Sequence, residues 1–153
     1  MKKSILFLTA ILFLSLSCSA AGKMHSAKNG EAMKISIQIT SERGSHKLTA
    51  TLSDNSSAKA FYQLLQKEPL VLNLNEYGGF EKVGPLGRSL PRNDRQIATK
   101  AGDIMLYQGN QVTIFYKGNS WSYSPLGKID GMSQAELESI LGSGNVTAVF
   151  TKL

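Results

Sequence analysis

Cysteine is almost absent from the 153-residue sequence, and its one cysteine, Cys18, precedes the part that we expect to fold. A domain that starts after this residue has no disulfide, no thiolate nucleophile and no thiolate metal ligand. Histidine is equally scarce, because His25 and His46 stand alone, without the short spacings that a zinc site needs. We therefore expect no metal site and no bound cofactor.

Dense charge of one sign is also lacking. Lys and Arg outnumber Asp and Glu by 17 to 11, which gives a formal charge of +6, but the positive residues are scattered. A loose cluster occurs at Arg88, Arg92 and Arg95, whereas a nucleic-acid site more often shows a dense basic stripe with interleaved aromatics. We interpret the basic balance as a solvated surface and expect no nucleic-acid partner.

No apolar run is long enough to span a bilayer comfortably, since that takes about 20 residues. The most apolar stretch, residues 5–14, follows Lys2 and Lys3. A positive start followed by a short apolar block is typical of a secretory signal. We therefore expect residues 1–21 to be a signal peptide.

The end of this segment resembles a bacterial lipobox, with the small Ser17 directly before Cys18 and apolar residues upstream. The resemblance implies cleavage before Cys18 and lipidation of that residue, which would anchor the protein to a bacterial membrane on the extracytoplasmic side. Ser15 stands where the lipobox prefers Leu. The alternative is a secreted or periplasmic protein that is cleaved after Ala20 or Ala21.

Residues 22–32 are polar and rich in small side chains, so we expect a flexible tether there. Residues 33–153 have the length and the ordinary composition of one globular domain. Alternating apolar and polar residues predict that this domain is mainly β. The strand candidates are residues 33–40, 47–52, 70–74, 103–107, 111–116 and 145–150.

Turn residues connect two pairs of these candidates into hairpins, at residues 42–45 and 108–110. In the second turn we expect Gly109 and Asn110 to adopt positive φ, which both residue types reach at little cost. The strand after it is apolar on both faces, with Val112, Ile114 and Tyr116 on one and Phe115 on the other. Such a strand is covered on both sides, as in a barrel wall or a sheet backed by a helix.

Two short helices are predicted between the strands. Asp54 or Asn55 can cap the first, and Pro69 ends it. Ser133 and Glu136 form a capping-box pattern at the second, and Gly142 is placed to end it in the left-handed conformation. With six to eight strands, we expect a small closed β-barrel capped by two short α-helices.

Several segments, in this order, resemble the bacterial cyclophilin-like domain family. They are DNSSAKAF at 54–61, Leu90-Pro91, AGDIMLY at 101–107, FYK at 115–117, LGKI at 126–129 and LGSGNVT at 141–147. The resemblance covers nearly all of residues 33–153. It implies a closed barrel with helices over its open ends, and the family as a class has no established activity.

True cyclophilins carry a Phe-His-Arg run and a Phe-x-x-Gln-Gly-Gly-Asp segment, and neither occurs in this sequence. Gly78-Gly79-Phe80 is weakly similar to the Phe-x-x-Gln-Gly-Gly-Asp segment, but it lacks the Gln. We therefore expect a binding or accessory module without catalysis, present as a monomer, that takes a small molecule or a peptide. The alternative is a peptidyl-prolyl cis-trans isomerase.

We expect a site in two segments that we interpret as loops, residues 75–95 and 119–125. The first is long enough that it must hold irregular structure or a short strand. In the second, Trp121 and Tyr123 alternate and would form an aromatic platform for a ligand, or else fold back as a lid on the core. In the first, Arg88 and Arg92 would clamp a carboxylate or phosphate, or else hold the loop by a structural ion pair. For Asp103 we expect a turn-stabilising role.

Overall fold

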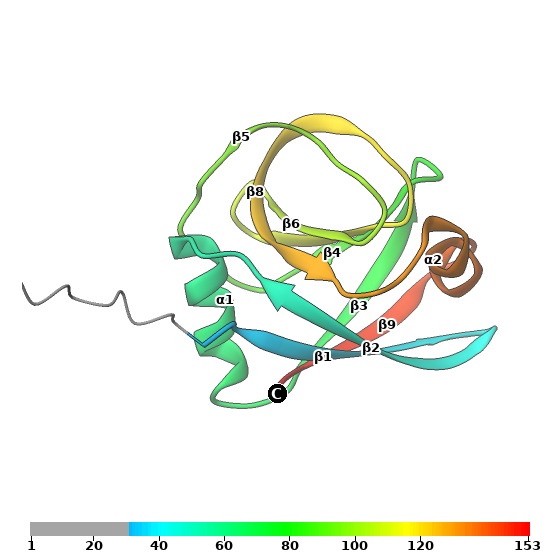
Figure 1. Cartoon of the computed structure of the whole chain (residues 1–153), viewed down its shortest axis with the longest axis horizontal. Helices are drawn as coiled ribbons and strands as arrows, with labels where there is room; N and C mark the ends of the chain where they lie inside the picture. Colours follow the sequence, from blue (N-terminus) through cyan, green and yellow to red (C-terminus); the bar gives the residue numbers. More distant parts are fainter. Residues whose placement is uncertain (1–30) are drawn as a thin grey trace, which may run out of the picture. The chain divides into compact units, whose positions relative to one another are not determined.

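Nine β-strands and two α-helices form from residues 31–153, the part of the chain that the computed structural model describes (Figure 1). The predicted signal peptide at 1–21, the lipidation residue Cys18 and most of the predicted tether lie outside the described residues. The elements are β1 Lys34–Ser41, β2 Gly44–Leu52, α1 Ser56–Leu65, β3 Leu70–Tyr77, β4 Glu81–Pro85, β5 Arg95–Ala98, β6 Asp103–Tyr107, β7 Gln111–Phe115, β8 Ser120–Ile129, α2 Gln134–Leu141 and β9 Val146–Lys152.

Eight of these strands close into an antiparallel barrel, in the order β2-β1-β9-β3-β4-β7-β6-β8, with β2 paired to β8. At the closure, Gly127 of β8 lies opposite Leu52 of β2. A Cβ atom on Gly127 would lie 2.6 Å from the carbonyl oxygen of Thr51, so only glycine lets the two strands approach this closely. The closed, mainly β barrel with two helices that the sequence predicts is confirmed.

The barrel interior is filled by the apolar side chains that alternate along the strands. The members at every second position of β1, β2, β7 and β9 are buried: Ile35, Ile37, Ile39, Leu48, Ala50, Leu52, Val112, Ile114, Val146, Ala148 and Phe150. This alternation is the pattern from which the strands were predicted, and it places one hydrophobic core inside the ring.

The helices cover the barrel on opposite sides of the view in Figure 1. Asn55 caps α1 by accepting a hydrogen bond from the backbone N–H of Ala58 at 2.9 Å. Phe61 of α1 then packs edge-on against Phe150 of β9, with ring centroids 5.5 Å apart. α2 begins with the predicted capping box of Ser133 and Glu136. Among the described residues, neither helix has the length and apolar character needed to cross a membrane.

The two segments where we expected a site are partly strand, which was foreseen as a short strand for 75–95 but not for 119–125. The segment at 119–125 forms the first half of β8, where β5 pairs with Ser120–Tyr123, in the upper part of Figure 1. The segment at 75–95 holds the end of β3 and all of β4. In β8, Pro125 lies beside a β-bulge at which the register to β6 shifts, so its missing N–H is tolerated there.

Two predicted turn conformations are wrong. Gly142 ends α2 with a right-handed φ of −47°, and it is Gly144 that adopts positive φ, at +73°. In the turn between β6 and β7, Gln108 and Gly109 have positive φ, at +51° and +78°, and Asn110 does not. The loop has the three residues that were predicted, but its left-handed positions fall one residue earlier than expected.

Candidate functional site

A second, smaller apolar cluster lies on the outer face of the barrel wall. It forms because β7 is apolar on both faces: Val112 and Ile114 point inward, whereas Phe115 points outward. Phe115 is buried there together with Met105 of β6 and Tyr123 of β8. Ile97 of β5 packs against the same cluster, so β5 and the first half of β8 cover this part of the wall.

Beside this cluster lies a pocket with a volume of about 670 Å³. Most of its lining comes from the β3–β4 hairpin and the first half of β8, the two segments where the sequence led us to expect a site. The lining residues are Tyr77, Gly78, Phe80, Glu81, Val83, Tyr107, Gln111, Asn119, Trp121 and Tyr123.

Aromatic rings form a continuous run along the pocket. Phe80 packs between Tyr77 and Phe115, with ring centroids 5.9 Å and 6.3 Å away. Tyr123 continues the run, 5.3 Å from Phe115 and 5.9 Å from Tyr107. At the rim, Tyr77 is 61% exposed, and Trp121, which also lines the pocket, is 58% exposed. The pocket thus offers ring surface that a ligand can cover.

Glu81 is the charged residue of this lining, and it is only 5% exposed. It lies opposite Phe115 of β7 and Tyr77 of β3. Its Oε2 atom is buried and has no hydrogen-bond partner. Burial, with a contribution from the charge of Glu76, raises the pKa of Glu81 to about 7.

A second unpartnered polar atom lies on the same outer face. Within residues 31–153, the buried side-chain atoms without a partner are Oε2 of Glu81 and Oγ1 of Thr113. Thr113 pairs with Val83, two residues along β4 from Glu81, so both side chains leave the wall on the same side. Buried polar groups in folded proteins are almost always paired, and two exceptions on one face mark it as unusual.

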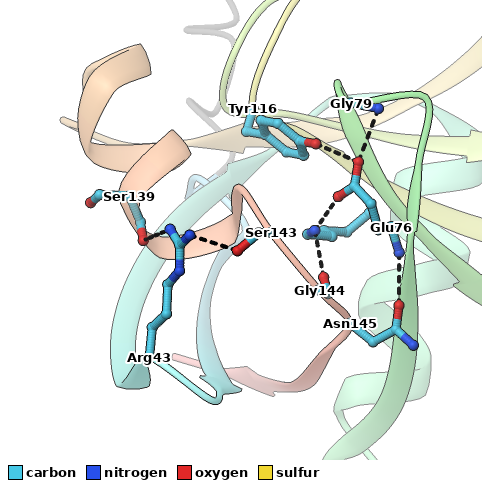
Figure 2. A network of polar contacts seen from close by, with 9 residues as sticks. Arg43, Glu76, Gly79, Tyr116, Ser139, Ser143, Gly144 and Asn145 are labelled. Carbon is cyan, nitrogen blue, oxygen red and sulfur yellow. Dashed lines mark hydrogen bonds and ion pairs between the residues drawn. The ribbon is translucent and has the colours of Figure 1, made fainter.

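Behind the hairpin, by contrast, Glu76 is fully satisfied. Figure 2 shows its carboxylate accepting hydrogen bonds from the hydroxyl of Tyr116 at 2.5 Å and from the backbone N–H of Gly79 at 2.9 Å. The fully buried ammonium of Lys82 donates to Glu76 and, at 2.7 Å, to the carbonyl of Gly144. Burial favours a higher pKa for Glu76, but the Lys82 and Tyr116 hydrogen bonds outweigh it and lower the pKa below its ordinary value.

This network fixes the β3–β4 hairpin that supplies half of the pocket. At the hairpin tip, Gly78 has a φ of +64°, and a Cβ atom on it would lie 2.2 Å from the ring of Phe80. The glycine therefore allows both the turn and the position of the Phe80 ring over it. The local sequence Tyr77–Glu81 thus builds a rigid wall for the pocket.

The structure brings together two of the four predicted ligand-binding residues. Trp121 and Tyr123 both line the pocket, Tyr123 as a buried residue and Trp121 as an exposed one. Arg88 and Arg92 do not line it. Arg92 instead forms an ion pair with Asp94, the structural role that we considered for it, and Arg88 is exposed between β4 and β5.

Tyr77, Glu81 and Tyr107 are not among the residues that we expected at a site from the sequence, and Phe80 was noted only in the Gly78-Gly79-Phe80 run. The signal that could have found Tyr77, Phe80 and Glu81 is their position in a long Gly-rich segment. Asp103 has the expected turn-stabilising role, because it accepts a hydrogen bond from the backbone N–H of Lys100 at 2.8 Å. In the part of the chain that the structure describes, no three His, Cys, Asp or Glu side chains are grouped so that they could hold a metal ion.

Comparisons with known proteins agree with this architecture. The model of the cyclophilin-like family matches residues 42–151. Among solved structures, the hypothetical protein AF2241 from Archaeoglobus fulgidus has a similar fold, with a TM-score of 0.57 and 12% identity over 82% of this chain and 99% of that one. A search of the curated proteins gave no match. Since the family model covers more than half of the sequence, the chain belongs to the cyclophilin-like family.

Proposed function

We propose that this domain is a binding module without catalysis, which takes a small molecule or a short peptide segment into the pocket between the β3–β4 hairpin and β8. The observation that carries the proposal is the aromatic lining, with Tyr77 and Trp121 exposed at its rim. Ligand sites in proteins are concave and mostly apolar, with a few polar groups that orient the ligand. The volume of about 670 Å³ is in the usual range for such sites.

Prolyl isomerisation is the alternative activity. It needs an apolar slot for the proline ring together with a cation or donor near the peptide nitrogen. The pocket offers the apolar slot, and Gln111 and Asn119 bring amide donors, but it has no cation, because no Lys, Arg or His belongs to its lining and Arg88 and Arg92 lie elsewhere. This lining favours binding over isomerase chemistry.

A titration can test binding at this pocket, because Trp121 is the only tryptophan of the chain and its fluorescence reports on the site. We would screen small molecules and short peptides of all three charge types against the protein. For a ligand that binds, Tyr77→Ala is expected to weaken affinity about tenfold, since a large aromatic contact is lost. Val71→Ala is the matched control: Val71 is as exposed as Tyr77 and lies on the same strand, but it does not line the pocket.

The same protein should be tested with a coupled proline-peptide assay. We expect no turnover above background. Turnover that is lost in Arg88→Ala or Arg92→Ala would overturn the view that the domain only binds. If no compound in the screen changes the Trp121 signal, the pocket is not a binding site and the proposal fails.

We further propose that the domain acts as a monomer outside the cytoplasm, held to a bacterial membrane by lipid on Cys18. The support is the sequence of residues 1–21, with its positive start, apolar block and lipobox-like end. Globomycin, which blocks lipoprotein signal cleavage, and Cys18→Ala should both abolish membrane-bound mature protein in cell fractions. Soluble, unmodified protein in the untreated wild type would refute the anchor.

A further inference from the structure

We propose that the pocket selects organic cations, whose ammonium group is held against the aromatic rings and paired with the carboxylate of Glu81. This inference rests on the proposed binding function and names its ligand class. Such a cation is either the head of a small molecule or the side chain of a lysine in a peptide. Three observations support it: the charge of the pocket lining, the unpartnered Oε2 of Glu81 and the aromatic rings beside it.

The charge of the lining has one sign. The chain carries 17 Lys and Arg residues, yet none of them lines the pocket, and Glu81 is the lining residue that ionises near neutral pH. Lys82 follows Glu81 directly in β4, but successive side chains of a strand point to opposite faces. Lys82 therefore lies on the inner face, where it is bound to Glu76 and Gly144.

The unpartnered Oε2 of Glu81 favours cations over anions and neutral apolar ligands. An anion would meet the carboxyl of Glu81 and would be repelled as this group ionises. A neutral apolar ligand would bring neither charge nor donor to Oε2 of Glu81, which is already buried without a partner, so it would gain nothing there. A primary ammonium supplies the missing donor, a quaternary ammonium balances the charge alone, and the low dielectric of the buried site strengthens either pairing.

The rings add a second attraction for positive charge. The face of an aromatic ring attracts cations within about 6 Å of its centroid, most strongly for Trp. Phe80, Tyr107, Tyr123 and the two rim residues, Tyr77 and Trp121, all line the same pocket as Glu81. Aromatic walls with one carboxylate form a suitable environment for an ammonium ion.

Cation binding should depend on pH, because Glu81 must be ionised. The titratable residues that line the pocket with it are Tyr77 of β3, Tyr107 of β6 and Tyr123 of β8. Glu76 lies on the other face of the hairpin, bound to Lys82, although its charge still acts on Glu81. The pKa of Glu76 is lowered below its ordinary value and that of Tyr123 is raised above it, so neither group changes charge near pH 7. With the pKa of Glu81 at about 7, its ionised fraction, and hence the affinity, rises about tenfold from pH 6 to pH 8.

The test compares choline with 3,3-dimethylbutan-1-ol, which has the same shape without the charge. Both are titrated into the full chain in an uncharged maltoside detergent, with Trp121 fluorescence as the readout. We expect choline to bind at least about tenfold more tightly than the alcohol at pH 8. Nα-acetyl-lysine methylamide, titrated in parallel, shows whether a lysine side chain of a peptide is also accepted.

Glu81→Gln should reduce choline binding about tenfold at pH 8, leaving only the attraction of the rings, and should remove the pH dependence. Glu68→Gln removes the same charge at an exposed position away from the pocket and should change neither property. Tyr77→Leu is a second variant at an exposed position, where folding is little affected. It should weaken choline severalfold and leave the alcohol unchanged, since it removes a ring and keeps apolar surface.

Equal affinity for choline and the alcohol, or full choline affinity in correctly folded Glu81→Gln, would overturn the cation inference while the binding function stands. The same holds if compounds of the mixed-charge screen bind but no cation is among them. If no compound of any charge binds, the proposed function itself fails. The two failures are therefore distinguishable.

Discussion

Glu81→Gln should change how the stability of the domain depends on pH. In the wild type this carboxyl group is 5% exposed, and its Oε2 has no hydrogen-bond partner. Burial and the charge of Glu76 raise its pKa from an ordinary 4.5 to about 7. Because the folded state holds its proton more tightly than the unfolded state does, folding is favoured most where the group is protonated in both states.

The sign and size of the effect follow from that difference. Below pH 4.5 the contribution of Glu81 to the free energy of unfolding is fully present, and it falls as the pH rises to about 7. Each pKa unit corresponds to about 1.4 kcal/mol, so roughly 3 kcal/mol is lost over this window. Glutamine cannot ionise, so Glu81→Gln should become more stable relative to the wild type by this amount between pH 4.5 and pH 8.

Urea denaturation of residues 31–153, followed by Trp121 fluorescence, measures this difference at half-unit pH steps. Other titrating groups cancel when the variant is subtracted from the wild type at each pH. The exposed Glu68→Gln serves as the control and should give a flat difference. A flat difference for Glu81→Gln as well would show that Glu81 is solvated in solution, and the reasoning about the pocket would be wrong.

Three further substitutions test the packing that positions the pocket, each by urea denaturation. Glu76→Leu should destabilise the domain by roughly 3 kcal/mol, because the buried ammonium of Lys82 loses its carboxylate partner. Gly127→Ala should cost about 2 kcal/mol or more, since the new Cβ would lie 2.6 Å from the Thr51 carbonyl at the barrel closure. Asn55→Ala should cost about 1 kcal/mol through loss of the α1 cap, and a change below about 0.3 kcal/mol would contradict that role.

The barrel could be predicted because the side chains that fill its interior recur at every second residue of a strand. Where one face of a strand is buried, apolar residues recur at every second position, as at Ile35, Ile37 and Ile39. The two helices could be predicted from their N-cap residues, Asn55 and Ser133. The alternation within a strand and the cap of a helix are local patterns, so they can be recognised in the sequence without knowing the strand order.

The outer wall could not be predicted in this way. In β8 the first half pairs with β5 outside the ring and the second half pairs with β6, and the bulge beside Pro125 breaks the alternation between them. β4 is buried on both faces and contains Glu81, Lys82 and Gly84, so it has no apolar period at all. Its burial depends on strands β3 and β7, which are far apart in sequence.

The contrast between two neighbouring carboxyl groups argues for a functional role of the pocket. Glu76 is paired with Lys82 and Tyr116, and its pKa is lowered, whereas Glu81 is left without a partner for Oε2 and its pKa is raised. Strand alternation places Lys82 on the face of Glu76, so Glu81 cannot share that ammonium. The fold stabilises one carboxylate from within and leaves the other beside a pocket without Lys or Arg in its lining, and the proposed cation binding rests on this contrast.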